Sequence, residues 1–121
     1  MNKKPIIVYR IQNDRKVGPF NANFYVSLLN KNTMLADQWR DHMNNFPAIQ
    51  EDFDTYSEEY YCACHQLELI KEWFGQFLDE LAQKKFFMAV YQTSDYYISK
   101  SGKQVIFNLD ESIMIEAKSL A

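Results

Sequence analysis

The sequence contains few residues of the kinds that interrupt or cross-link a chain. It has three glycines, three prolines and two cysteines among 121 residues. Disordered linkers are rich in glycine and proline, so their scarcity argues against a long linker. Cys62 and Cys64 are separated by a single residue, and such close neighbours rarely reach disulfide geometry. This spacing argues against a small secreted scaffold held together by disulfide bonds.

Long apolar runs are missing as well. No run approaches the roughly 18 residues that a membrane span needs. A short apolar stretch follows Lys4, but Arg10 interrupts it before it reaches the length of a secretion signal. The length fits one domain. We therefore expect a single domain over residues 1–121 that stays in the cytoplasm and has no membrane association.

Positive charge is absent from the middle of the chain. The formal net charge is only −3, but residues 41–70 contain no Lys or Arg. The same stretch carries seven carboxylates: Asp41, Glu51, Asp52, Asp54, Glu58, Glu59 and Glu68. Such a field repels nucleic acid and attracts a basic surface. We expect no direct nucleic-acid binding.

The patterning of what is present predicts an α+β fold. Apolar residues at helical spacing over 66–85 predict the main amphipathic helix, with Gly75 as its weak point. A shorter helix is predicted near 33–43, where Thr33 can cap its first turn. Residues 21–32 stay ambiguous between a strand and a short helix, and 44–55 are expected to form an acidic loop. β-Branched, aromatic or continuously apolar segments predict strands at 5–12, 60–64, 86–91, 96–99, 104–107 and 113–115.

These elements predict a mostly antiparallel sheet of about five strands with the main helix on one face. That arrangement would bury the apolar stripe of the helix and one side of the sheet together. Residues 100–103 separate two strands, and Gly102 can adopt the positive φ that a hairpin turn requires.

The acidic region also contains aromatic residues, and this mixture predicts a protein-binding surface. Rigid aromatic rings beside negative charge suit a basic protein partner. The same pattern could imitate a nucleic-acid backbone. The alternative without a binding role is a solvated loop whose aromatic rings pack into the core. The predicted contact residues are Phe46, Glu51, Asp52, Phe53, Asp54, Tyr56, Glu58 and Glu59.

A metal site is considered because thiolate and imidazole are good zinc ligands. The candidates are Cys62, Cys64 and His65, with His42 as a fourth ligand. Their spacing differs from the two-to-four-residue gaps of zinc fingers. In a strand Cys62 and Cys64 point to one face and His65 to the other. We therefore predict two buried cysteines beside an exposed histidine, and no metal. A cysteine nucleophile would need a positioned base, and no motif supplies one.

Several short segments together resemble a family of small proteins encoded by phages and prophages. They are Val8-Tyr9-Arg10, Gly18-Pro19-Phe20, Phe46-Pro47, residues 62–74 and Gln104-Val105-Ile106-Phe107. The resemblance implies a small protein of the infected bacterial cytoplasm. Many such proteins act by binding a host protein, including host defence nucleases.

A second resemblance is to ADP-ribosyltransferase-like folds, which bind NAD. It implies catalytic positions at Tyr9 or Arg10 on an early strand and at Gln104 on a late one. Those enzymes often use a glutamate where this chain has Gln104, and a neutral amide stabilises a cationic sugar less well.

Our leading hypothesis is a binding protein without a cofactor that inhibits or redirects a host protein with a basic surface. The alternatives are an NAD-dependent ADP-ribosyltransferase-like enzyme and a structural protein that self-associates through a strand edge. We expect a monomer or a homodimer.

Overall fold

The structure is a computed structural model that describes residues 4–19, 22–46, 49–53 and 59–120. It confirms the α+β class. The elements in chain order are β1 (Ile6–Gln12), α1 (Ala22–Lys31), α2 (Thr33–Met43), α3 (Ile49–Asp52), β2 (Tyr60–Ala63), α4 (Leu67–Phe74), the 3-10 turn η1 (Gly75–Phe77), α5 (Leu78–Gln83), β3 (Phe87–Thr93), β4 (Tyr96–Ile98), β5 (Val105–Asn108), the 3-10 turn η2 (Leu109–Glu111) and β6 (Ile113–Lys118).

The described strands form two antiparallel three-stranded sheets instead of the single sheet of about five strands that the sequence predicted. In the first sheet β3 lies between β1 and β6, and in the second β5 lies between β2 and β4. Among the described residues, backbone hydrogen bonds join the two sheets at one residue pair. The N–H of Tyr9 donates to the carbonyl of Cys64 (2.7 Å), and the N–H of Cys64 donates to the carbonyl of Tyr9 (2.9 Å). Because the ladder between β1 and β2 is limited to this bridge, the two sheets separate.

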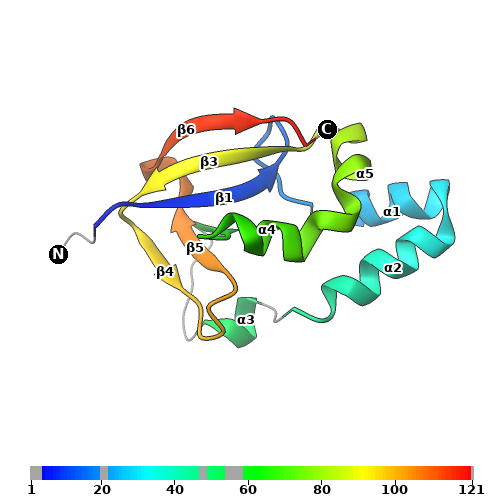
Figure 1. The fold of residues 1–121 in the computed structure, drawn as a ribbon, viewed down its shortest axis with the longest axis horizontal. Coiled ribbons are helices and arrows are strands. Elements are labelled where there is room, and N and C mark those ends of the chain that lie inside the picture. Colours follow the sequence, from blue (N-terminus) through cyan, green and yellow to red (C-terminus); the bar gives the residue numbers. More distant parts are fainter. Residues whose placement is uncertain (1–3, 20–21, 47–48, 54–58, 121) are drawn as a thin grey trace.

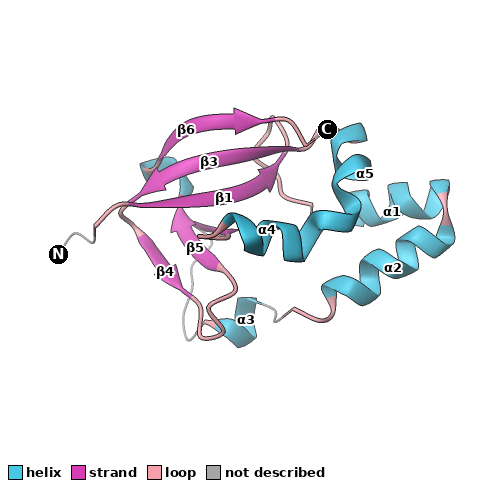
Figure 2. Ribbon diagram, viewed as in Figure 1, coloured by secondary structure: helices cyan, strands magenta, loops and turns pink. Residues whose placement is uncertain are grey.

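The helices and the second sheet cover opposite faces of the first sheet. Alternate residues of a strand point to opposite faces. Accordingly, Ile11 of β1 belongs to a core cluster with Phe74 and Phe77, whereas Val8 belongs to a cluster with Phe107 of β5. Figure 1 shows α4 running beside β1, and Figure 2 shows the helices gathered beside the strands. Both faces of the central strand β3 are therefore buried.

The predicted helix at 66–85 is interrupted at its expected weak point. The α-helical stretch α4 ends at Phe74, η1 begins at Gly75, and α5 resumes at Leu78. Phe74 leaves helical geometry with φ −125°. Glycine stabilises a helix interior poorly, so the chain can tighten there at little cost. The break changes the direction of the helix (Figure 1) while both Phe74 and Phe77 stay buried.

Residues 22–31, which the sequence left ambiguous, form a helix. Phe24 and Leu28 are buried one turn apart and pack α1 against the core. The side chain of Asn32, instead of the predicted Thr33, caps α2 by accepting the N–H of Met34 at 3.0 Å. The ring of Trp39 on α2 meets Phe24 edge-on, with centroids 4.8 Å apart. The helix predicted near 33–43 is confirmed.

Two further predictions concern residues 44–55 and the hairpin of β4 and β5. Residues 44–55 were expected to be a loop, but they contain the short helix α3, which ends at Asp52. The hairpin of β4 and β5 is confirmed, and Gly102 in its turn has φ +73°.

Candidate partner-binding surfaces

Asp52 is the centre of a buried hydrogen-bond cluster that ties α3 to the β4–β5 turn. Its carboxylate accepts the N–H of Ser101 (2.8 Å), the hydroxyl of Ser101 (2.6 Å) and the side-chain amide of Gln104 (3.0 Å). Its backbone carbonyl accepts the N–H of Lys100 at 2.9 Å. The residue is only 3% exposed. A carboxylate whose oxygens are met by several donors can be buried at acceptable cost.

These donors determine the charge state of the buried carboxyl. Burial by itself raises the pKa of Asp52, because it disfavours the charged form. Hydrogen bonds from Ser101, Gln104 and Ser99 act in the opposite direction, and the resulting pKa lies below its ordinary value. Asp52 is therefore an ionised structural residue. It fixes one end of residues 51–59, which we call the acidic segment.

This position corrects part of the predicted contact surface. Asp52 and Phe53 are both buried, so neither side chain is available to a partner. Phe46 is half-buried and stacks on Trp73 with centroids 4.1 Å apart. Phe46 and Phe53 therefore follow the alternative prediction, in which the aromatic rings pack into the fold. The reason is that α3 brings Phe53 inward together with the Asp52 carboxylate.

The other residues of the predicted contact surface divide into two groups. Glu51 and Glu59 are exposed. Asp54, Tyr56 and Glu58 lie outside the described residues. The structure therefore places an exposed carboxylate on each side of residues 54–58, with Asp52 as the buried anchor.

Arg10, a candidate of the enzyme alternative, is tied into the fold by its guanidinium. It donates to the backbone carbonyls of Cys62 (2.6 Å) and Lys16 (3.2 Å) and to the side chain of Gln12 (3.2 Å). It also lies over the ring of Tyr61, 5.1 Å from its centroid. Burial lowers the pKa of Arg10 by disfavouring its charge.

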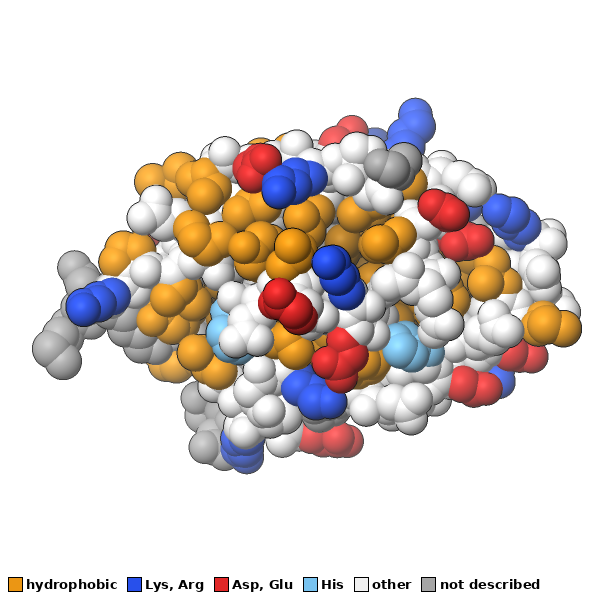
Figure 3. All heavy atoms as spheres, viewed as in Figure 1, with side chains coloured by type: hydrophobic (Ala, Val, Ile, Leu, Met, Phe, Trp, Pro, Cys, Tyr) orange, Lys and Arg blue, Asp and Glu red, His pale blue; other side chains and the backbone are white. Residues whose placement is uncertain are grey.

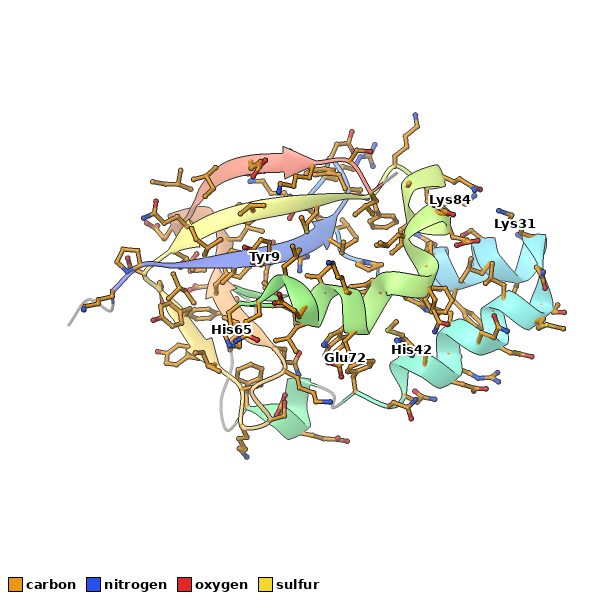
Figure 4. All side chains as sticks on the ribbon, viewed as in Figure 1. Tyr9, Lys31, His42, His65, Glu72 and Lys84 are labelled. Atoms are coloured by element: carbon orange, nitrogen blue, oxygen red, sulfur yellow. The ribbon has the colours of Figure 1, made fainter. Side chains whose placement is uncertain are left out.

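Arg10 and Gln104 serve separate hydrogen-bond clusters. The amide of Gln104 donates to Asp52, and its backbone N–H donates to the hydroxyl of Ser99 at 3.2 Å. Tyr9 lies on β1 beside α4 (Figure 4), where its backbone forms the bridge between the sheets. The contacts of these three candidates are structural, and catalysis by them stays a prediction.

The metal candidates do not form a ligand set in the part of the chain that the structure describes, where no group of three or more His, Cys, Asp or Glu residues could hold an ion. Burial is the main cause that raises the pKa of the Cys62 thiol, and it raises the pKa of Cys64 to about 12. The Nε2 of His42 lies 3.0 Å from the carbonyls of both Glu72 and Trp73. Figure 4 shows His42 beside α4, away from His65.

A second polar cluster, which sequence reasoning missed, fixes β2 to the opposite end of the hairpin. The hydroxyl of Tyr60 donates to Asp95 at 2.7 Å, and Asn108 donates to the same carboxylate at 3.4 Å. The pKa of Tyr60 is raised mainly because its proton is held by this hydrogen bond to Asp95. The cluster anchors the strand that follows the acidic segment.

β6 presents an apolar strand to solvent. In the described parts of the chain it pairs only with β3, and each of its six residues is exposed. Ile113, Met114 and Ile115 are large apolar residues. Figure 3 shows hydrophobic side chains gathered over the upper part of the visible face, where Figure 1 places β3 and β6. The sequence predicted a strand at 113–115, but its apolar residues gave no sign that they would be exposed.

Comparison with known proteins identifies the family. A family model described as Bacteriophage T4 Y00F protein matches residues 1–121. The chain belongs to this family. The match confirms the resemblance to small phage-encoded proteins. Comparison with curated proteins and with solved structures gave no match. Among the described residues of this phage protein, no helix is long and apolar enough to cross a membrane.

Proposed function

We propose that this Y00F-family protein is a binding protein that inhibits or redirects a protein of the bacterial host in the host cytoplasm. The observation that carries the proposal is the anchored acidic segment. Glu51 and Glu59 are exposed on the two sides of the segment, and residues 41–70 contain seven carboxylates but no Lys or Arg. The partner chemistry that fits is a basic protein surface.

The way the segment is held supports its use in recognition. Asp52 fastens one side of it to the β4–β5 turn, and Tyr60 fastens the other side through Asp95. A segment fixed at both ends has less conformational freedom to lose on binding than a free tail. Glu51 and Glu59 therefore act from defined positions on the fold.

The chemistry of the other candidates favours binding over catalysis. The raised pKa values of Cys62 and Cys64 keep both thiols protonated near neutral pH, whereas a nucleophilic cysteine needs its thiolate. Arg10 and Gln104, the residues on which the enzyme alternative depends, already have structural partners. A role in host takeover or against host defence is the corresponding biological proposal.

A capture experiment tests the proposal. Tagged wild-type protein is incubated with bacterial lysate, and retained proteins are identified by mass spectrometry beside the Glu51→Lys/Glu59→Lys variant. We expect one stoichiometric host protein with wild type and its loss with the variant, because charge reversal turns attraction into repulsion. A control variant, Asp14→Lys/Asp79→Lys, makes the same change in net charge at exposed sites elsewhere.

Two results would contradict the proposal. The first is a host protein retained equally by wild type and by the Glu51/Glu59 variant, which would remove the acidic segment from the contact. The second is equal loss of the partner with both double variants, which would show that net charge alone governs retention. Circular dichroism spectra identical to that of wild type establish that each variant is folded.

A further inference from the structure

The edge strand β6 is apolar, so it suits a different kind of partner from the one that the acidic segment suits. Ile113, Met114 and Ile115 are 65%, 49% and 51% exposed. The strand itself contains one acid and one base, Glu116 and Lys118. The Nζ of Lys118 lies 3.7 Å from the Oε2 of Glu116. A strand edge of this kind offers unpaired backbone groups and apolar side chains together. Its partner must therefore supply another strand and an apolar surface, and need not carry positive charge.

The order of residues along β6 makes the strand complementary to itself in the antiparallel direction. Two exposed acids, Asp110 and Glu111, precede it in η2, the apolar block follows, and the ion pair of Glu116 and Lys118 ends it. Antiparallel pairing places Lys118 of one copy beside Asp110 and Glu111 of the other. Parallel pairing would instead place like charges together, which destabilises a strand pair.

We infer that β6 is the contact between two copies of this chain, paired antiparallel about Met114. In this register Met114 faces Met114 of the second copy, Ile113 faces Ile115, and Lys118 lies beside the acidic turn at Asp110. The three exposed apolar residues of each copy then cover those of the other. Two copies related by a twofold axis form a self-complementary interface of this type.

Pairing would extend the first sheet from three strands to six. The order would be β1-β3-β6 of one copy followed by β6-β3-β1 of the second, so each outer edge of β6 gains backbone hydrogen bonds. The β-bulge in β6, where Ile115 falls between the residues opposite Val90 and Tyr91, sets a limit on the contact. A bulge increases local twist, and the contact is confined to one short strand. We therefore expect a reversible dimer instead of an obligate one.

Sedimentation velocity over about 1 µM to about 1 mM protein tests this inference, because a weak contact populates the dimer only toward millimolar concentration. Wild type should rise from the 14.4 kDa monomer toward twice that mass. Met114→Lys and Met114→Glu should each stay monomeric, because residue 114 faces itself. An equimolar mixture of the two variants should recover the dimer, since opposite charges then meet at the axis. Met34→Lys, which changes an exposed methionine on α2, should dimerise like wild type.

Each other outcome overturns the inference. A wild-type monomer at every concentration excludes the contact, and association that survives Met114→Lys places it elsewhere. A mixture of Met114→Lys and Met114→Glu that stays monomeric excludes pairing about Met114. The Glu51→Lys/Glu59→Lys variant, which tests host binding, should dimerise normally, so failure of one proposal is distinguishable from failure of the other.

Discussion

The buried carboxylate of Asp52 gives the sharpest prediction for the stability of the fold. Asp52→Ala removes the acceptor for the backbone N–H of Ser101, the hydroxyl of Ser101 and the amide of Gln104. A hydrogen bond to a charged group contributes about 1.5–3 kcal/mol, and a buried donor left without an acceptor adds a desolvation cost. Because the turn can relax toward water, we expect a loss of about 3 kcal/mol in the free energy of unfolding.

The substitution Asp52→Asn separates charge from hydrogen bonding. The amide keeps one acceptor oxygen and nearly the same shape, so we expect a smaller loss of about 1–2 kcal/mol. Equilibrium unfolding in urea measures both variants, with Glu51→Ala as the matched control because Glu51 is the exposed neighbour. The control should change stability by less than about 0.5 kcal/mol. A loss below about 1 kcal/mol for Asp52→Ala would refute the anchoring role.

The pH dependence of this effect has a definite sign. The pKa of Asp52 is depressed in the folded protein, so its stabilising contribution is present above the unfolded-state pKa of about 4. It is lost as the pH falls through the lower folded-state pKa. The stability difference between wild type and Asp52→Asn should therefore shrink between about pH 4 and pH 2. A difference that grows over this range would contradict the assignment.

Three other predictions test separate features. Gly75→Ala should stabilise the protein by about 0.5–1 kcal/mol in urea unfolding, because an added Cβ meets nothing within 4 Å and φ is −52°; destabilisation would show that the break needs glycine. Arg10→Lys should destabilise it by about 2 kcal/mol, because an ammonium group cannot reproduce the planar fork that reaches three acceptors; a change below about 0.5 kcal/mol would contradict this. Cys62, which is half-buried, and Cys64, which is buried, should react with iodoacetamide near pH 8 mainly after unfolding, because both pKa values are raised in the fold; rapid labelling of both in the native protein, detected by mass spectrometry, would contradict the raised pKa values.

Local sequence signals predicted most elements of the fold. The continuously apolar run that begins at Phe86 predicted β3, and Gly102 predicted the hairpin turn between β4 and β5. Periodicity over 66–85 located α4 and α5, and Gly75 marked the break between them. Such signals are readable because each depends on residues that are close together in the chain.

The remaining features depend on contacts between distant residues. Asp52 is one carboxylate within an acidic run, and such runs are usually solvated, yet its donors come from a turn about fifty residues later. The separation into two sheets follows from the limited contact between Tyr9 and Cys64. The signal that could have identified the anchor is the polar pair Ser101 and Gln104, whose side chains donate to Asp52.

The affinity of the captured host protein at two ionic strengths tests directly whether the acidic segment binds it. Calorimetric titrations would compare wild type with the Glu51→Lys/Glu59→Lys variant at about 0.05 M and about 0.5 M salt, where the screening length differs severalfold. We predict that wild-type binding weakens at high salt and that the variant binds poorly at both salt concentrations. Equal affinities for the two proteins, independent of salt, would contradict recognition through the acidic segment.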